Sequence, residues 1–489
     1  MHEWLFNRPL LLLCLAFALS LVLHWNFLGN DIAGIHAWRQ TQTMTVVENF
    51  ATEDLHILNP RINSRGDGDG IFRMEFPLMQ WTFAWFYKWF GEKLIIARLL
   101  TFCISAMSVL GFYRLLRAWD LPKTTAAGGA WCLCWSPVLF YYAINPLPDN
   151  LALCFGIWSL AFLKRYRSTS STGALLGFGA LLSLATAVKL PFILFGTGFI
   201  PLFIRGSRQR DFGRILSHSL LILLTMTPAI VWYLWVIPSW GNAEIISGTD
   251  STGSFDYVSA LNTIWGTLTF MLIELFVNYG AVLFFIFGIV YVLRNMRHSF
   301  DHYQVELSIL LACILFFLYE VNVIGLAHDY YLFPFLPIIF LVVTKGMSML
   351  INHKLKWLRA VSLVAIMVLP LTAYLRTMDR WTPSTRAQTL LTHKQDLRNV
   401  VPDDALVVAG NDISHHIMLY HIGKKGWVFN DDRLTAEVLS EHIENGATYL
   451  YSNTDGIYTD DGIASLLEEL LFEENGLKVY SLKQPGGPE

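Results

Sequence analysis

The stretch DIAGIHAWRQTQT, Asp31 to Thr43, is unusually polar for a segment that directly follows a hydrophobic run. If residues 35–50 form a helix, His36, Arg39 and Gln40 recur at spacings of three and four and share one face. Arg39 would present a fixed cation suited to a phosphate, and His36 could donate or accept a hydrogen bond or bind a metal. A polar helix face turned to solvent explains the same pattern, so both interpretations stay open.

A carboxylate stands further along in FRMEFPL, where Glu75 lies two residues before Pro77. It precedes an aromatic-rich piece, FPLMQWTFAWFYKWF, which is typical of a helix lying in a membrane interface. A carboxylate at a helix start can be a simple cap, but it can also act as the general base that an acceptor hydroxyl needs. Asp31, Asp67 and Asp69 are the other acids of this region, and the last two fit a Gly-rich turn.

Further ionisable groups lie at the ends of apolar segments. Lys189 follows ATAV, and His328, Tyr330 and Tyr331 belong to LAHDYYLFPFLP. Ionisable groups at membrane depth are energetically costly and are therefore functional candidates. Lys189 could instead snorkel to a lipid headgroup, and the tyrosines could be interfacial belt residues.

The composition indicates what must position these groups. With 54% hydrophobic and 15% charged residues, the chain is predicted to be a polytopic α-helical membrane protein. A net charge of -3 gives no support for nucleic-acid binding. About eleven segments are long enough to cross a membrane; they are 9–28, 95–116, 126–142, 147–163, 173–188, 191–204, 215–237, 279–293, 305–323, 331–350 and 357–375.

Lys and Arg are concentrated in alternate short loops, which predicts the orientation of the chain. By the positive-inside rule these loops are cytoplasmic, and so is the amino terminus. An odd number of spans then places the carboxyl terminus outside. The basic loops are 114–123, 164–167, 205–214, 294–297 and 345–359.

Two external regions follow from this topology: a long loop, 29–93, within a membrane domain of residues 1–375, and a polar domain of residues 376–489. In the latter, ALVVAG, GWVFN, ATYLYS and LKVYSL are predicted strands. Helical patterns cover Ile413–Tyr420, Leu434–Asn445 and Ile463–Glu474. The alternation predicts a small α/β domain with a largely parallel sheet.

Five local motifs occur in order along the chain: HAWRQTQT, EFPL, PDNLALCFG, VKLP and HDYYLFPFLP. Together with the topology they resemble the GT-C glycosyltransferases, in particular the family-39 type that includes protein O-mannosyltransferases and lipid A aminoarabinose transferases. The resemblance covers the whole chain. It implies a GT-C membrane fold of about eleven helices with a small periplasmic α/β domain, in the bacterial inner membrane.

The resemblance also implies an activity. Such enzymes transfer a sugar from a polyprenyl phosphate, in bacteria undecaprenyl phosphate, to a lipid, glycan or protein acceptor outside the membrane, with inversion. Arg39 and Lys189 would bind the donor phosphate, with His36, Gln40, His328, Tyr330 and Tyr331 as further substrate-binding residues.

The chain departs from the family in one respect. Positions nearest the usual acidic pair of the first external loop hold Arg39 and Gln40, so Asp31 leads as the base by location and Glu75 follows. His36 could take that role or help to bind a divalent metal ion, Mg²⁺ or Mn²⁺, but the sequence establishes no cofactor. A transporter or lipid-linked sugar flippase is the alternative from another class, and a glycan ligase with a diphosphate-linked donor is a third.

Overall fold

The computed structural model describes residues 8–208, 211–240, 255–298, 300–325, 327–430 and 434–484. The chain forms two compact units. The helical unit comprises Met1–Gly29, Met74–Met79 and Ile95–Met378, and the mixed unit comprises Asn30–Arg73, Gln80–Leu94 and Asp379–Glu489.

This grouping differs from a division at residue 375, because most of the first external loop belongs with the carboxy-terminal residues. Backbone hydrogen bonds tie the loop to a strand of the mixed unit: Gly426 N–H donates to the Asn63 carbonyl at 3.1 Å, and Arg65 N–H donates to the Gly426 carbonyl at 3.0 Å. Lys425 Nζ also donates to Glu53 Oε1.

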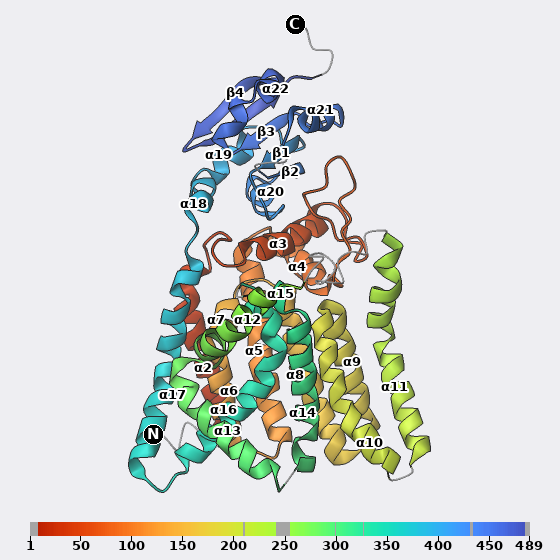
Figure 1. Cartoon of the computed structure of the whole chain (residues 1–489), viewed down its shortest axis with the longest axis vertical. Helices are drawn as coiled ribbons and strands as arrows, with labels where there is room; N and C mark the ends of the chain where they lie inside the picture. Colours follow the sequence, from red (N-terminus) through yellow and green to blue (C-terminus); the bar gives the residue numbers. More distant parts are fainter. Residues whose placement is uncertain are drawn as a thin grey trace. The chain divides into compact units, whose positions relative to one another are not determined.

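Long helices make up most of the helical unit (Figure 1). Neighbouring helices α13 and α16 approach closely because both carry glycine at the contact. A Cβ added at Gly288 would overlap the carbonyl of Val342, and one at Gly346 would overlap that of Phe284. The helices of the unit are α2 (Pro9–His24), α5 (Leu94–Ala118), α6 (Lys123–Cys134), α7 (Pro137–Tyr142), α8 (Pro148–Thr169), α9 (Thr172–Val188), α10 (Ile200–Arg208), α11 (Phe212–Val231), α12 (Tyr257–Gly266), α13 (Val282–Met296), α14 (Phe300–Tyr319), α15 (Val321–Ile324), α16 (Leu336–Ile351) and α17 (Lys356–Thr377).

Eight helices among the described residues are long and apolar enough to cross a membrane, so the predicted count of about eleven is not confirmed. The predicted span 126–142 is divided between α6 and α7 at Pro137, which cannot continue a helix ladder. Two other predicted spans are shorter apolar helices, Thr172–Val188 and Leu190–Arg205. Conversely, Tyr257–Val277, which is absent from the eleven predicted spans, is itself a candidate span.

The mixed unit contains α3 (Ala37–Thr52) and most of α4 (Leu78–Phe90) from the external loop, followed by the carboxy-terminal elements. Its sheet has the strand order β2-β1-β3-β5-β4. The first three strands are parallel, and β5 pairs antiparallel with both β3 and β4. The elements are α18 (Thr385–Thr392), α19 (Lys394–Asn399), β1 (Leu406–Gly410), α20 (Ile417–Ile422), β2 (Lys425–Phe429), α21 (Ala436–Glu444), β3 (Tyr449–Ser452), α22 (Asp461–Leu466), β4 (Leu467–Glu474) and β5 (Leu477–Leu482).

Alternation along β1 builds a core on each face of this sheet. Val407 packs with Leu397 and Leu419 on one face, and Val408 packs with Leu439 on the other. The predicted helix over Ile463–Glu474 is wrong beyond its first residues. The chain leaves α22 and forms the edge strand β4, because pairing with β5 outweighs the helical spacing of its leucines.

Candidate functional site

In the helical unit, the start of α8 positions a buried carboxylate. Pro148 occupies the first turn of the helix, where its missing N–H costs nothing, and Asp149 follows it. The Asn150 side chain donates to the carbonyls of Tyr142 and Asn145, each at 3.0 Å, and so fixes the loop that leads into the helix. Asp149 is 1% exposed at a position where the helix dipole favours negative charge.

Lys189 ends α9 and faces this carboxylate. Its Nζ lies 3.7 Å from Asp149 Oδ1, and both side chains are buried. The same ammonium lies 5.2 Å from the ring centroid of Tyr331 and 5.8 Å from that of Tyr330, within cation–π range. Lys189 therefore contacts protein groups rather than extending to a lipid headgroup.

The aromatic turn η8 (Asp329–Phe335) completes this cluster. The buried hydroxyl of Tyr142 donates to Asp329 Oδ1 at 2.7 Å. The His328 ring lies 5.9 Å from the rings of both Tyr330 and Tyr331. The structure thus brings together Lys189, His328, Tyr330 and Tyr331, four residues that the sequence singled out.

Glu75 is held in the same unit. Phe76 N–H donates to the Ala187 carbonyl at 2.9 Å, two residues before Lys189, and Trp232 Nε1 donates to the Met74 carbonyl at 3.1 Å. Glu75 is therefore anchored on both sides, and it is 7% exposed. Its buried carboxylate belongs to the segment that is bonded to the end of α9.

In the mixed unit, His36 lies outside the predicted shared helix face. It precedes α3 in the left-handed region with φ 58°, and its carbonyl accepts the N–H groups of Arg39 and Gln40 at 3.1 Å each. The predicted face therefore begins at Arg39. Arg39 and Gln40 are buried; Arg39 donates to Gln42 Oε1, and the Gln40 amide donates to the Ile35 carbonyl at 3.2 Å.

Asp31 accepts a hydrogen bond from Lys394 Nζ, and its side chain is 38% exposed. A proton acceptor at this position would first have to give up that ion pair. The neighbouring His421 ring is buried and contacts the Ile32 carbonyl at 3.1 Å through Nε2. Burial, assisted by Lys394, lowers the pKa of His421 to about 3.

Two titratable residues of the mixed unit, Glu48 and His416, were not identified as candidates from the sequence. Burial raises the pKa of Glu48 on α3 to about 7, although Arg398 opposes the shift. Burial, with Arg39 second, lowers the pKa of His416 to about 3. Glu48 is the one acidic residue of the predicted helix 35–50, and this feature of the sequence could have marked it as a candidate. The proximity of His416 to Arg39 had no local signal.

A metal site was left open by the sequence. Across the described residues, no group of three or more His, Cys, Asp and Glu side chains is placed to hold a metal ion.

Comparisons with known proteins extend this picture. Residues 75–235 match the family model of dolichyl-phosphate-mannose-protein mannosyltransferase. No curated protein matches the chain by sequence. ArnT from Cupriavidus metallidurans in the apo state superposes with a TM-score of 0.68 at 12% identity, over 97% of this chain and 98% of that chain. ArnT from the same organism bound to undecaprenyl phosphate gives 0.63 at 12% identity, over 97% and 98%. The arabinofuranosyltransferase AftD from Mycobacteria gives 0.52 at 12% identity, over 96% of this chain and 41% of that chain.

The chain is therefore a multi-span membrane protein with the GT-C fold and a small carboxy-terminal sheet region. The family match over residues 75–235, taken together with this fold, indicates a membrane glycosyltransferase of the GT-C type. The class predicted from the sequence is confirmed.

Proposed function

We propose that this glycosyltransferase transfers a single sugar from a polyprenyl phosphate to a lipid, glycan or protein acceptor on the external face, with inversion at the anomeric carbon. The observation that carries the proposal is the buried Lys189, held beside Asp149 and the two tyrosine rings. Support for the donor class comes from the ArnT structure with bound undecaprenyl phosphate, since the two folds correspond over nearly the full chain.

The ammonium group and the hydrogen-bond donors of the cluster suit a phosphate leaving group. A phosphate ester leaves as an anion, so it needs a cation and hydrogen-bond donors to hold it, and needs no acid to protonate it. Lys189 supplies the cation, and His328, Tyr330 and Tyr331 supply donors around it. Asp149 orients the ammonium and limits its rotation, because their charged atoms lie 3.7 Å apart in a buried setting.

Glu75 takes the acceptor proton in this proposal. Its carboxylate is buried in the unit that holds Lys189, on the segment bonded to Ala187. Asp31 is the second choice because it lies in the mixed unit, whereas Glu75 and Lys189 belong to the helical unit. His36, Arg39 and Gln40 belong to the mixed unit, where we assign them to contacts with the acceptor or the carrier phosphate.

By the positive-inside rule the basic loops, and with them the amino terminus, face the cytoplasm of a bacterial cell. The basic loop 345–359 directly precedes the last candidate span among the described residues, Lys356–Trp381, so in this proposal the carboxy-terminal domain lies in the periplasm. In this orientation the sugar arrives on its carrier at the external leaflet, and transfer needs no nucleotide-activated donor.

The test uses purified protein in liposomes that contain an undecaprenyl-phosphate-linked sugar. Release of undecaprenyl phosphate is expected only after an envelope lipid and glycan fraction is added as acceptor. The variant Glu75→Gln should lose turnover and keep undecaprenyl phosphate binding, while the matched variant Asp31→Asn keeps turnover. Movement of the donor across the bilayer without release would favour a flippase instead, and full activity in Glu75→Gln would remove this carboxylate from the mechanism.

A further inference from the structure

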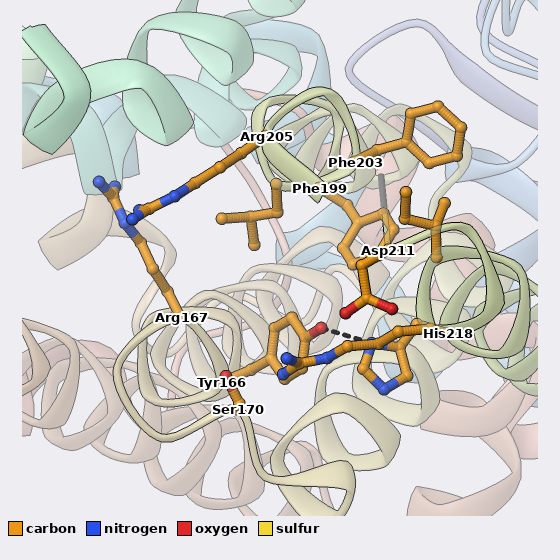
Figure 2. A pocket seen from close by; sticks show the side chains of 11 residues that line it. Tyr166, Arg167, Ser170, Phe199, Phe203, Arg205, Asp211 and His218 are labelled. Atoms are coloured by element: carbon orange, nitrogen blue, oxygen red, sulfur yellow. Dashed lines mark hydrogen bonds between the residues drawn. The ribbon is translucent and has the colours of Figure 1, made fainter. Parts of the chain in front are cut away.

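A pocket of about 240 Å³ lies among the ends of α8, α10 and α11 in the helical unit. It is lined by basic, aromatic and aliphatic side chains (Figure 2). These residues are Tyr166, Arg167, Ser170, Phe199, Leu202, Phe203, Arg205, Asp211, Arg214, Ile215 and His218. The proposed glycosyl transfer uses none of them.

The polar part of the lining has an excess of positive charge. Arg167, Arg205 and Arg214 contribute guanidinium groups, against the single carboxylate of Asp211. Arg167 donates to the Asp301 and His302 carbonyls, the latter at 3.3 Å, and a guanidinium has further N–H donors to offer. Planar guanidinium groups match phosphate oxygens in charge and geometry.

A tyrosine and a histidine form the floor between these charges. The Tyr166 hydroxyl lies 2.6 Å from His218 Nδ1, as Figure 2 shows. The bond joins the last turns of α8, which carry Arg167, to the second turn of α11, whose first turn carries Arg214. The pocket is thus built by packed elements rather than by a loop alone.

The remaining wall is apolar and continues onto the outer surface of the unit. Phe199, Leu202 and Ile215 line the pocket, and Phe203 beside them is 45% exposed. Leu216, the next residue along α11, is 62% exposed. A ligand with a phosphate group and an apolar chain would satisfy both parts of the lining.

This pocket is separate from the Lys189 cluster. Asp149 lies in the first turn of α8 and Arg167 in its last turn. Their sequence separation of 18 residues, at about 1.5 Å rise per residue, places them about 27 Å apart along the helix axis. The positive-inside rule accounts for basic residues in this region, but it does not require that they line one concave site together with an apolar wall.

We propose that this pocket binds the phosphate headgroup of an anionic membrane phospholipid, with its acyl chains along the apolar wall. Basic pockets between membrane helices are suited to such headgroups. The bound lipid would fasten α10 and α11 to the end of α8. The site would be occupied whether or not sugar donor is present, so this proposal does not depend on the proposed function.

The experiment is native mass spectrometry of the purified full chain, titrated with phosphatidylglycerol. Wild-type protein should retain phosphatidylglycerol in preference to phosphatidylcholine, and the double variant Arg205→Gln/Arg214→Gln should bind it at least about tenfold more weakly. The control variant Arg359→Gln removes an exposed charge from the first turn of α17 and should bind like wild type. Arg205→Lys/Arg214→Lys keeps the charge and should recover most of the binding.

Three results would overturn the proposal. One is equal retention of phosphatidylcholine and phosphatidylglycerol, and another is undiminished phosphatidylglycerol binding in the Gln double variant. The third is displacement of bound lipid by inorganic phosphate or by undecaprenyl phosphate at equal concentration, which would assign the pocket to a free anion or to the carrier. If the double variant does not fold, the single variant Arg205→Gln, at an exposed side chain, gives the same comparison.

Discussion

The ion pair between Lys189 and Asp149 yields a prediction that separates stability from catalysis. Replacing Lys189 by Met keeps an unbranched side chain that is one heavy atom shorter and removes the ammonium, so the Asp149 carboxylate stays buried without this cation. At 3.7 Å the attraction is about 4 kcal/mol for an effective dielectric constant of about 20. Removing one partner of a buried pair typically costs about 3–5 kcal/mol. We therefore expect Lys189→Met to lower the unfolding temperature clearly.

The double variant Lys189→Met/Asp149→Asn removes both charges and should regain most of that stability, because a neutral amide is less costly to bury than an ionised carboxylate. Its turnover should stay low, since the cation for the donor phosphate is still missing. A loss of about 2–4 kcal/mol of transition-state stabilisation corresponds to a decrease of about 30-fold to 1,000-fold in kcat/KM.

A second buried pair in the helical unit provides the matched control. Lys164 Nζ lies 2.8 Å from Glu306 Oε1; the Lys164 side chain is buried and that of Glu306 is 13% exposed. Lys164→Met should also destabilise the protein, and Lys164→Met/Glu306→Gln should recover, but both should retain turnover once corrected for folded protein. The measurements are thermal unfolding in detergent and release of undecaprenyl phosphate in liposomes.

Two outcomes would refute this reasoning. If Lys189→Met/Asp149→Asn transferred sugar at the wild-type rate, Lys189 would not be the phosphate cation. If the Lys164 variants lost turnover to the same extent as the Lys189 variants, the loss would report general damage to the helical unit rather than loss of a donor contact.

Further predictions concern other parts of the chain. Glu75→Gln should lower kcat by at least about 100-fold while its affinity for undecaprenyl phosphate, measured by native mass spectrometry, stays within about threefold of wild type. Burial lowers the pKa of His421 to about 3 in the folded protein, whereas the pKa in the unfolded chain is near 6.5. Between these two pH values the unfolded chain binds one proton more than the folded chain. The contribution of His421 to the free energy of unfolding is therefore fully present above about pH 6.5 and falls by about 1.4 kcal/mol per pH unit below it. The unfolding temperature of His421→Asn should therefore depend less on pH between about 7.5 and 5.5 than that of wild type, and an unchanged pH dependence would contradict the assignment. Gly346→Val would overlap the Phe284 carbonyl and should cost at least about 1–3 kcal/mol in an unfolding assay, whereas Gly213→Ala, whose Cβ meets nothing within 4 Å, should be tolerated.

The Lys189 cluster was accessible to sequence reasoning because membrane topology restricts where polar residues can lie. Lys189 and the HDYY motif stand at the ends of apolar segments far apart in sequence. When alternate segments run in opposite directions, such ends collect at one side of the membrane domain. No interpretation of side-chain contacts was needed to expect them together, although the identity of the buried partner Asp149 required coordinates.

The groups of the mixed unit were less accessible because tertiary contacts decide their state. His36 was expected on a helix face and instead adopts a left-handed backbone conformation before the helix begins. Asp31 pairs with Lys394, more than 360 residues away, and the sequence near either residue does not indicate the pair. Tertiary contacts also decide the structure of β4. Its leucine spacing favours a helix, but pairing with β5 makes it a strand.

Helix α8 shows why some of the chemistry could be located but not resolved from the sequence. Its first turn carries the carboxylate that holds Lys189, and its last turn carries Arg167 of the basic pocket. Any membrane-spanning helix could carry such polar ends: the helix dipole favours the carboxylate at the start of α8, and the positive-inside rule accounts for the arginine at its end. What distinguishes the two ends is their partners: a buried cation beside aromatic rings at one, converging arginines beside an apolar wall at the other. A substitution at one end should therefore alter either sugar transfer or lipid retention, and the two assays together report which role each end of α8 has.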